Sequence, residues 1–266
     1  MPKFFRWSQK LRWLSLSKPQ PTKNSPSVIS TRSFDHFDAR FCRHFLQIFI
    51  AFFATMKKII LENSMYITCL DLEGVLVPEI WIAFSKESGI PELSRTTRDE
   101  PDYDKLMEWR IGILREKGLR LSDIQKTIAK IDPLPGAKEF LDSLRKECQT
   151  VIISDTFEQF AAPLMQKLGQ PTIFCNTLEI DSDGFITKHK MRCEKSKLTT
   201  VRALQSIGFD TIASGDSYND LAMIEASRAG FLFRTTEKIR ADYPTLPAFT
   251  EYSELLEAIK AQLKKN

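Results

Sequence analysis

The sequence predicts an α/β fold built on an open, mainly parallel sheet, and three observations indicate it. The second half of the chain alternates short apolar runs with helical patterns of roughly 10 to 15 residues, which is typical of βαβ units. Polar residues directly follow several of these runs, where parallel strands carry ligand sites at their carboxyl ends. The composition, with 42% hydrophobic and 27% charged residues, is that of a globular protein and excludes collagen-like or mainly disordered chains.

The length and the cysteine content further limit the class of protein to which the chain can belong. A chain of 266 residues is long enough for one or two domains with a substantial core. Its 5 Cys, an odd number without a C-x-x-C pair, argue against a disulfide framework or a zinc ribbon, so we expect the reducing cytoplasm. No apolar run reaches the roughly 18 residues of a membrane-spanning helix, and we expect no membrane partner.

The first 64 residues differ from the rest in charge. They hold 11 Lys and Arg but 3 Asp and Glu, a net charge of +8, whereas the remaining 27 basic and 31 acidic residues give −4. A nucleic-acid role would therefore rest on this segment alone, and we expect no nucleic-acid partner. The composition of residues 1–33 also fits an organellar transit peptide, but we favour a disordered or mis-annotated extension, with translation starting at Met65 or Met56.

Ordered structure is predicted from Tyr66 onward. Residues Tyr66–Asp71 form an apolar run that predicts a buried first strand. Helical patterns follow at Glu79–Ser88, at Asp102–Lys117 and from Leu121 or Ser122 to about Lys130, the first two ended by glycines. Three helices are too much for a simple connection between strands, so residues 79–132 are interpreted as an inserted small helical cap. Residues 65–78 and 133–266 are then the core.

After Pro133 and Pro135 the pattern becomes that of an open, Rossmann-like parallel sheet. A D-G pair at Asp183–Gly184, between alternating apolar residues, predicts a β-hairpin over 177–191. The other expected elements are strands at 150–154, 172–175, 211–214 and 230–233, and helices at 136–146, 157–168, 195–207, 218–227 and from about 253.

Three of the predicted strands end in polar residues that are capable of chemistry. These residues are Asp71 and Glu73, then Ser154 and Asp155, then Asp216, Asn219 and Asp220, with Lys195 and Lys197 on the helix before the last strand. Each has an ordinary structural interpretation, because Asp or Ser after a strand commonly caps a helix and a helical Lys usually faces solvent. Together, however, four carboxylates at one sheet edge would repel one another.

A hard divalent cation would remove that repulsion, and a set of oxygen ligands points to Mg²⁺. The Ser, the Lys and nearby loop amides are suited to hold an anion. Carboxylates, Mg²⁺ and anion donors in one site are what phosphoryl transfer requires, since charge spreads over the phosphoryl oxygens in the transition state.

The order of these motifs resembles a known family. D-x-[DE]-G-V, a strand-terminal Ser, a Lys and G-D-S-x-N-D follow one another as in the haloacid dehalogenase-like phosphatases. The resemblance covers about residues 65–266 and is greatest to the phosphoserine phosphatase branch, in particular to its bifunctional phosphoserine phosphatase/homoserine phosphotransferase type. It rests on the stretches MYITCLDLEGVLVPEIWIAF, TTRDEPDYDKLM, VIISDTFEQF and SGDSYNDLAM.

The resemblance implies roles for the matching residues. Asp71 would be the nucleophile that becomes a phosphoaspartate, and Glu73, where most relatives have Asp, the general acid and base. Mg²⁺ would bind Asp71, the Glu73 carbonyl and Asp216, with Asp220 as a ligand or as support. Phosphoryl oxygens would contact Ser154, the Asp155 amide and Asn219, and Lys197, or alternatively Lys195, would neutralise their charge.

The resemblance also implies the substrate, O-phosphoserine. Glu79 would hold its ammonium group and Arg110 its carboxylate, although Arg110 could equally be a packing or surface residue. Whether water or homoserine accepts the phosphoryl group stays open. His189 is expected to be solvated rather than catalytic.

Other functions compete with this one. They are a capped phosphatase acting on a sugar or nucleotide phosphate, a receiver-type signalling domain, and a nucleic-acid binder with an inactive phosphatase body. A receiver has its nucleophile on the third strand and lacks a counterpart of G-D-S-x-N-D, and the intact motifs argue against an inactive body.

Overall fold

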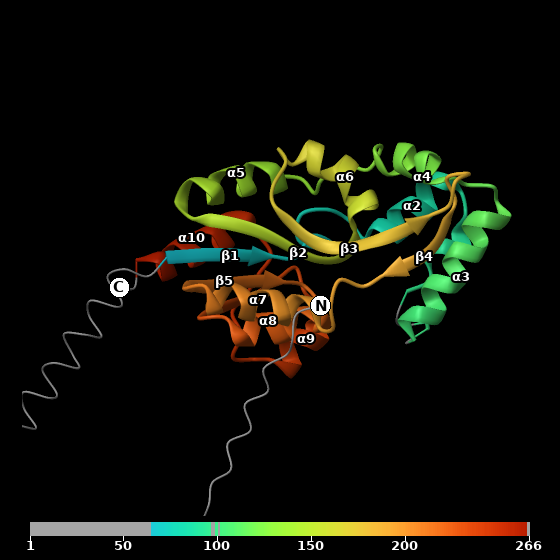
Figure 1. The fold of residues 1–266 in the computed structure, drawn as a ribbon. Coiled ribbons are helices and arrows are strands. Elements are labelled where there is room, and N and C mark those ends of the chain that lie inside the picture. Colours follow the sequence, from blue (N-terminus) through green and yellow to red (C-terminus); the bar gives the residue numbers. More distant parts are fainter. Residues whose placement is uncertain (1–64, 97–98, 101, 265–266) are drawn as a thin grey trace, which may run out of the picture. The chain divides into compact units, whose positions relative to one another are not determined.

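The computed structural model describes residues 65–96, 99–100 and 102–264. The predicted extension at 1–64 lies outside the described residues. Strand β1 (Met65–Leu70) is the middle of a seven-stranded sheet with the order β4-β3-β2-β1-β5-β6-β7 (Figure 1). Neighbouring strands are parallel except β3 and β4. The remaining strands are β2 (Gln149–Phe157), β3 (Ile173–Ile180), β4 (Ile186–Lys190), β5 (Phe209–Gly215), β6 (Ala229–Phe233) and β7 (Ala248–Phe249).

The connections reverse direction at β1, and this fixes where a site can form. From β1 the chain proceeds to β2 and β3 on one side, and it returns to add β5, β6 and β7 on the other. Leu70, the last residue of β1, lies opposite Ile152 of β2 and Ser214 of β5. The carboxyl ends of these central strands therefore meet at the switch point, where open α/β sheets bind ligands.

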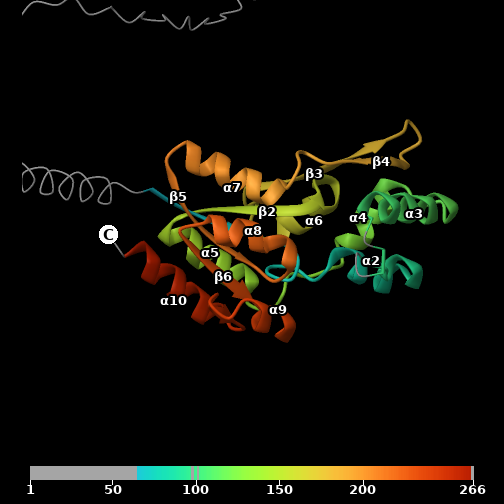
Figure 2. The same cartoon turned by 90° about the horizontal axis from the view of Figure 1, so that it is seen from below.

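Helices cover both faces of the sheet (Figures 1 and 2). Side chains of successive strand residues point to opposite faces, so Leu70 belongs to one apolar cluster and Cys69 to the other. The Leu70 cluster includes residues of α5 (Ala137–Glu147), α6 (Glu158–Lys167) and α10 (Tyr252–Leu263), and the Cys69 cluster includes residues of α7 (Ser196–Ser206), α8 (Leu221–Ala226) and α9 (Glu237–Asp242).

The segment between β1 and α5 is helical, as the spacing predicts. It contains α2 (Ile80–Ser88), the short 3-10 helix η1 (Pro91–Ser94), α3 (Tyr103–Glu116) and α4 (Leu121–Ile128). Gly89 ends α2 in the left-handed conformation, with φ of 69°, which glycine adopts without strain. This helical group lies beyond the carboxyl end of β1 (Figure 1), with α4 packed on α6 and α3 on β4. Its boundary as a separate cap stays a prediction.

Three details differ from the sequence expectations. The predicted short strand at 172–175 and the first arm of the hairpin are one continuous strand, β3, which pairs with β4. The helix expected at 218–227 is the 3-10 helix η2 (Tyr218–Asp220) followed by α8. Sequence periodicity missed η1, α9 and β7, because segments of two to six residues are too short to show a period.

No helix in the described ranges combines the length and apolar character that crossing a membrane requires.

Candidate active site

Asp71 occupies the first position after β1. Its backbone N–H donates to the Ser214 carbonyl at 3.0 Å, which continues the ladder between β1 and β5 beyond the strand end. Its Oδ1 accepts the Leu72 amide at 2.8 Å, and the residue is 4% exposed. The sheet therefore holds this carboxylate in a fixed orientation at the switch point.

Lys197, in the first turn of α7, pairs with this carboxylate. Its Nζ lies 2.9 Å from Oδ1 of Asp71 and 2.6 Å from Oδ1 of Asp220, and the residue is buried. Lys195 is exposed and occupies the N-cap position of α7, with φ of 47°. Of the expected Lys197 and its alternative Lys195, the structure brings Lys197 to the carboxylates.

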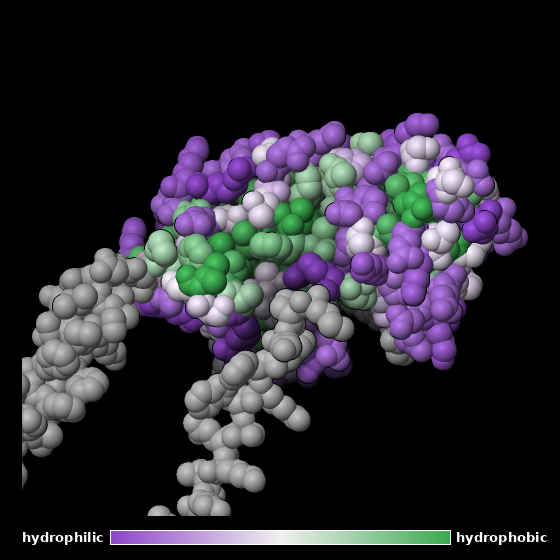
Figure 3. Space-filling model, viewed as in Figure 1, coloured by the Kyte–Doolittle hydropathy of each residue, from purple (hydrophilic) through white to green (hydrophobic). Residues whose placement is uncertain are grey.

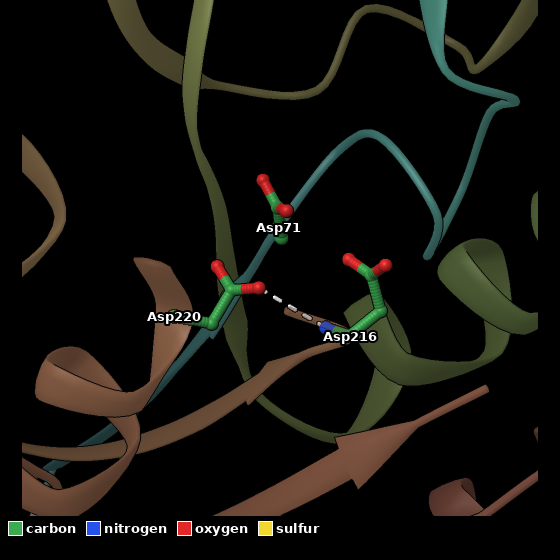
Figure 4. A group of neighbouring side chains, drawn as sticks. All are labelled: Asp71, Asp216 and Asp220. Atoms are coloured by element: carbon green, nitrogen blue, oxygen red, sulfur yellow. Dashed lines mark hydrogen bonds between the residues drawn. The ribbon is translucent and has the colours of Figure 1, made fainter. Parts of the chain in front are cut away.

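Asp71, Asp216 and Asp220 form a group in which one carboxylate oxygen of each lies within 4.8 Å of the others (Figure 4). Both oxygens of Asp220 are engaged, Oδ1 by Lys197 and Oδ2 by the amides of Asp216 and Ser217 and the Ser217 hydroxyl. By contrast, no other described residue donates a hydrogen bond to Oδ2 of Asp71 or to the Asp216 carboxylate. These two groups are therefore free to bind a cation.

The electrostatics of this group fit a divalent cation. Burial and the neighbouring charge of Asp220 raise the pKa of Asp71 well above its ordinary range. Burial and the charges of Asp220 and Glu79 raise the pKa of Asp216 to about 7. Carboxylates that repel one another in a partly buried site are stabilised by a hard cation that prefers oxygen ligands, such as Mg²⁺.

Gly74 allows the first loop to approach this group closely. A Cβ built on Gly74 would lie 2.5 Å from Cγ of Asp216, and the residue has φ of 74°. Both the space and the backbone conformation therefore require glycine in the D-x-E-G-V stretch. The glycine lets the loop that carries Asp71 and Glu73 lie directly against the Asp216 carboxylate.

Glu73 is held at the entrance to α2. Its Oε2 accepts the Ile80 amide at 2.8 Å, at the start of that helix. Burial, together with the negative charge of Glu79, raises the pKa of Glu73 to about 8. A carboxyl group with this pKa keeps its proton at neutral pH, which is the state that a general acid needs.

Ser154 and Asp155 lie near the end of β2, on the other side of Asp71. Ser154 is 2% exposed, and its Oγ accepts the Thr156 amide at 3.2 Å. The Asp155 carboxylate accepts the Ser196 hydroxyl at 2.6 Å and the Asn219 side-chain amide at 3.0 Å. Hydrogen bonds therefore join the loop after β5 and the start of α7 to the end of β2.

Arg110, on α3, is a buried cation without a carboxylate partner among the described residues. Its guanidinium lies over the Trp81 ring at 4.3 Å and donates to the Arg95 carbonyl at 2.6 Å, while its Nε has no hydrogen-bond partner. Burial lowers the pKa of Arg110 to about 10, and the charges of Glu73 and Glu79 oppose that shift. Arg110 is thus not the surface residue that the sequence left possible, and Glu79 is exposed at the N-cap of α2.

The expectation that His189 is solvated was wrong. Its side chain is 9% exposed, and its Nε2 lies 2.8 Å from Oδ1 of Asp104 on α3. The ring also packs edge-on against Tyr103 at 5.7 Å. The hairpin folds back against α3, which buries a residue that looks exposed in a two-stranded ribbon.

Sequence reasoning missed several residues that hold the site. Thr235 donates its hydroxyl hydrogen to the Asp216 carbonyl at 2.5 Å, and Asn176 donates to the Asp155 carbonyl at 2.9 Å. Thr235 lies just after a predicted strand, so the strand-end signal that identified Asp71 could have found it. Asn176 directly follows the predicted strand at 172–175 and carries the same signal. Ser196 has no such signal, because its importance arises from contacts between distant segments.

Comparisons with known proteins support one family. The haloacid dehalogenase-like hydrolase family matches residues 85–225. The chain is 50% identical over 191 residues to phosphoserine phosphatase ThrH of Pseudomonas aeruginosa, covering 72% of this chain and 93% of that protein. It is 48% identical over 201 residues to phosphoserine phosphatase of Pseudomonas syringae, covering 75% of this chain and 85% of that protein.

Solved structures agree on the fold. A substrate-bound phosphoserine phosphatase complex matches with a TM-score of 0.61 at 19% identity, covering 74% of this chain and 99% of that one. An apo phosphoserine phosphatase matches with a TM-score of 0.60 at 21% identity, covering 74% and 98%. At these identities the likeness concerns the fold alone.

Proposed function

The chain belongs to the haloacid dehalogenase-like hydrolase family, and on this premise we propose that it is a Mg²⁺-dependent phosphatase that hydrolyses O-phosphoserine through a phosphoaspartate at Asp71. One observation carries the proposal: the Asp71 carboxylate has one oxygen held by Lys197 and the other free, beside a Glu73 whose pKa of about 8 keeps it protonated. A fixed carboxylate nucleophile next to a protonated carboxyl group is what transfer of a phosphoryl group to a carboxylate needs.

In the first half-reaction, Oδ2 of Asp71 attacks phosphorus as the bond between phosphorus and the serine oxygen breaks. Glu73 donates its proton to that oxygen, so serine leaves as a neutral hydroxyl. Lys197 lies 2.9 Å from the other Asp71 oxygen, so its charge offsets the negative charge that gathers on the transferring phosphoryl group.

In the second half-reaction, the Glu73 carboxylate removes a proton from the acceptor hydroxyl, and the acceptor oxygen attacks phosphorus. The bond between phosphorus and the Asp71 oxygen breaks, which restores the carboxylate. Water as the acceptor gives inorganic phosphate, and homoserine gives O-phosphohomoserine. Two observations support homoserine as a second acceptor. The chain is 50% identical to phosphoserine phosphatase ThrH, and it has Glu rather than Asp at position 73.

Mg²⁺ would be held by the carboxylates of Asp71 and Asp216 and by the Glu73 carbonyl, while Oδ2 of Asp71 faces phosphorus. When bound, it would neutralise charge on the phosphoryl oxygens and orient them. Asp220 fits a supporting role rather than that of a ligand, because Lys197, Ser217 and the Asp216 amide already engage both its oxygens.

The substrate would lie between the sheet edge and the helical group at 79–132, which we propose acts as a cap. Ser154, the Asp155 amide and Asn219 would contact the phosphoryl oxygens. The substrate carboxylate would bind at Arg110, whose buried Nε has no hydrogen-bond partner. The substrate ammonium group would bind near the negative charge of Glu79.

The test is a phosphate-release assay over a panel of small phosphomonoesters, with Mg²⁺ or with EDTA. We expect O-phosphoserine to give the highest kcat/KM and EDTA to stop turnover. Added homoserine is expected to divert phosphoryl groups into O-phosphohomoserine, detected by ³¹P NMR. A preference for a sugar or nucleotide phosphate would replace the substrate proposed here, and activity in EDTA would contradict the metal requirement.

A further inference from the structure

We infer that the side chain of Asp155 is a positioning residue, which aligns the start of α7 and the loop after β5 with the end of β2. The inference rests on the proposed function and adds a role to it, since the phosphate contact proposed above for Asp155 is its backbone amide. The carboxylate itself would act through Ser196, Lys197 and Asn219, without touching the substrate.

The contacts of the carboxylate carry this inference. Each of its oxygens accepts one hydrogen bond, and the two donors come from different segments. Ser196 Oγ, at the start of α7, donates to Oδ1 at 2.6 Å, and Asn219 Nδ2, in η2, donates to Oδ2 at 3.0 Å. One side chain thus joins three segments that are far apart in the sequence.

The backbone of Asp155 is fixed from the opposite side. Its carbonyl accepts Nδ2 of Asn176 on β3 at 2.9 Å, and Oδ1 of the same Asn176 accepts the Arg192 amide at 3.0 Å. Arg192 belongs to the segment that leads into α7, and its guanidinium donates to the Ser196 carbonyl at 3.3 Å and to the Thr200 hydroxyl at 2.5 Å. Asp155 and Asn176 therefore close a ring of hydrogen bonds around the entry of α7.

Helix capping does not explain this carboxylate. Strand β2 continues to Phe157, which is also the N-cap position of α6, so Asp155 lies before that helix begins. At α7 the carboxylate accepts the Ser196 hydroxyl, with Lys195 in the N-cap position. The contacts that Asp155 makes are between segments rather than within a helix end.

A negative charge beside a phosphate site also needs a reason, because it repels a phosphate dianion. Hydrogen bonds to an ionised acceptor are stronger than those between neutral groups, so a carboxylate fixes its donors better than a neutral side chain. Ser196 directly precedes Lys197, whose Nζ lies within 2.9 Å of both Asp71 and Asp220. Alignment of Ser196 thereby aligns the lysine that neutralises the phosphoryl charge.

The experiment compares Asp155→Ala, Asp155→Asn and Ser196→Ala with the parent chain in Mg²⁺. It measures the inhibition constant of inorganic phosphate, kcat/KM for O-phosphoserine and for p-nitrophenyl phosphate, and Tm. Asp210→Asn is the matched control, because Asp210 also holds a hydrogen-bonded partner, Arg228, but lies at the opposite end of β5.

We expect Asp155→Ala to weaken phosphate inhibition roughly tenfold, the effect of losing about one charge-assisted hydrogen bond. Both substrates should lose kcat/KM by the same factor, since the phosphoryl group is common to them, while Tm changes little. Asp155→Asn, which retains one acceptor oxygen, should fall between. Ser196→Ala should weaken inhibition in the parent but add nothing in an Asp155→Ala background.

Phosphate inhibition within about twofold of the parent in Asp155→Ala, or additive effects of the two alanine variants, would overturn the inference. If Asp155→Ala does not fold, the same cycle with Asp155→Asn decides. A parent enzyme that cleaves p-nitrophenyl phosphate but not O-phosphoserine would refute the proposed substrate and leave this test in place.

Discussion

Nζ of Lys197 lies 2.9 Å from Oδ1 of Asp71, and both side chains are almost completely buried. The pair joins the first turn of α7 to the residue that follows β1. Burial alone would lower the pKa of Lys197, but the charges of Asp220 and Asp71 raise it above its ordinary value. The lysine therefore stays charged and holds the carboxylates of Asp71 and Asp220 in place.

Replacing Lys197 by Met is expected to reduce stability as well as activity. The change leaves two buried carboxylates without a cation, which destabilises proteins by about 3–5 kcal/mol. Urea unfolding monitored by circular dichroism measures the loss. Lys195→Met is the control, because Lys195 is exposed, and it should leave both stability and kcat unchanged. Equal behaviour of the two variants would contradict the assignment of Lys197.

Gly74→Ala is expected to damage the cation site more than the fold. The added Cβ would lie 2.5 Å from Cγ of Asp216, so that carboxylate has to move, and a φ of 74° strains any residue with a Cβ. We expect the Mg²⁺ concentration for half-maximal activity to rise at least about tenfold, in line with loss of one well-placed ligand. Gly118→Ala, also at positive φ but in open space, controls for backbone strain. A similar rise in both would show that strain alone is responsible.

Arg110→Ala is expected to lower kcat/KM for O-phosphoserine by at least about tenfold, since a charge-assisted pair contributes roughly 1.5–3 kcal/mol. Activity on p-nitrophenyl phosphate, which lacks a carboxylate, should change little. Arg110→Lys should restore part of the loss because it lacks the bidentate fork, and Glu79→Gln should also affect O-phosphoserine selectively. Equal losses on both substrates would mean that Arg110 supports the helical group instead of binding substrate.

The metal-free protein is expected to lose stability as the pH rises from 5 to 8. The folded state raises the pKa of Glu73 from 4.5 to about 8 and that of Asp216 from 3.8 to about 7, so it retains protons that the unfolded chain releases. Stability is then greatest below the unfolded values and is lost as the pH rises through the folded ones. The proposed Mg²⁺ site requires deprotonated carboxylates, so Mg²⁺ should raise Tm more at pH 8 than at pH 5.

Thermal unfolding in EDTA and in Mg²⁺ across this pH range measures the effect. Asp216→Asn removes one of these titrating groups, so its Tm in EDTA should depend less on pH than that of the parent. A parent Tm that rises with pH in EDTA would show that folding does not raise the pKa values of Glu73 and Asp216.

Much of the fold and the central carboxylates could be predicted from the sequence, because strand periodicity and strand-end residues are local signals. Asp71 and Asp216 were found in this way, whereas Lys197 was preferred to Lys195 on the family resemblance, and the structure brings all three together. Local signals do not show which residues meet across the fold. The burial of His189 against α3, the link from Thr235 to Asp216, and the Ser196 and Asn219 contacts of Asp155 depend on the packing of distant segments.

The most direct test of covalent transfer at Asp71 is the turnover of O-phosphoserine by Asp71→Asn in saturating Mg²⁺. Asparagine has nearly the same shape but is a very poor nucleophile, so kcat should fall by at least about a thousandfold while circular dichroism and Tm stay close to the parent. The variant must be assayed freshly purified, because deamidation restores aspartate. A folded Asp71→Asn enzyme that retains a substantial fraction of the parent kcat would contradict a phosphoaspartate intermediate at this residue.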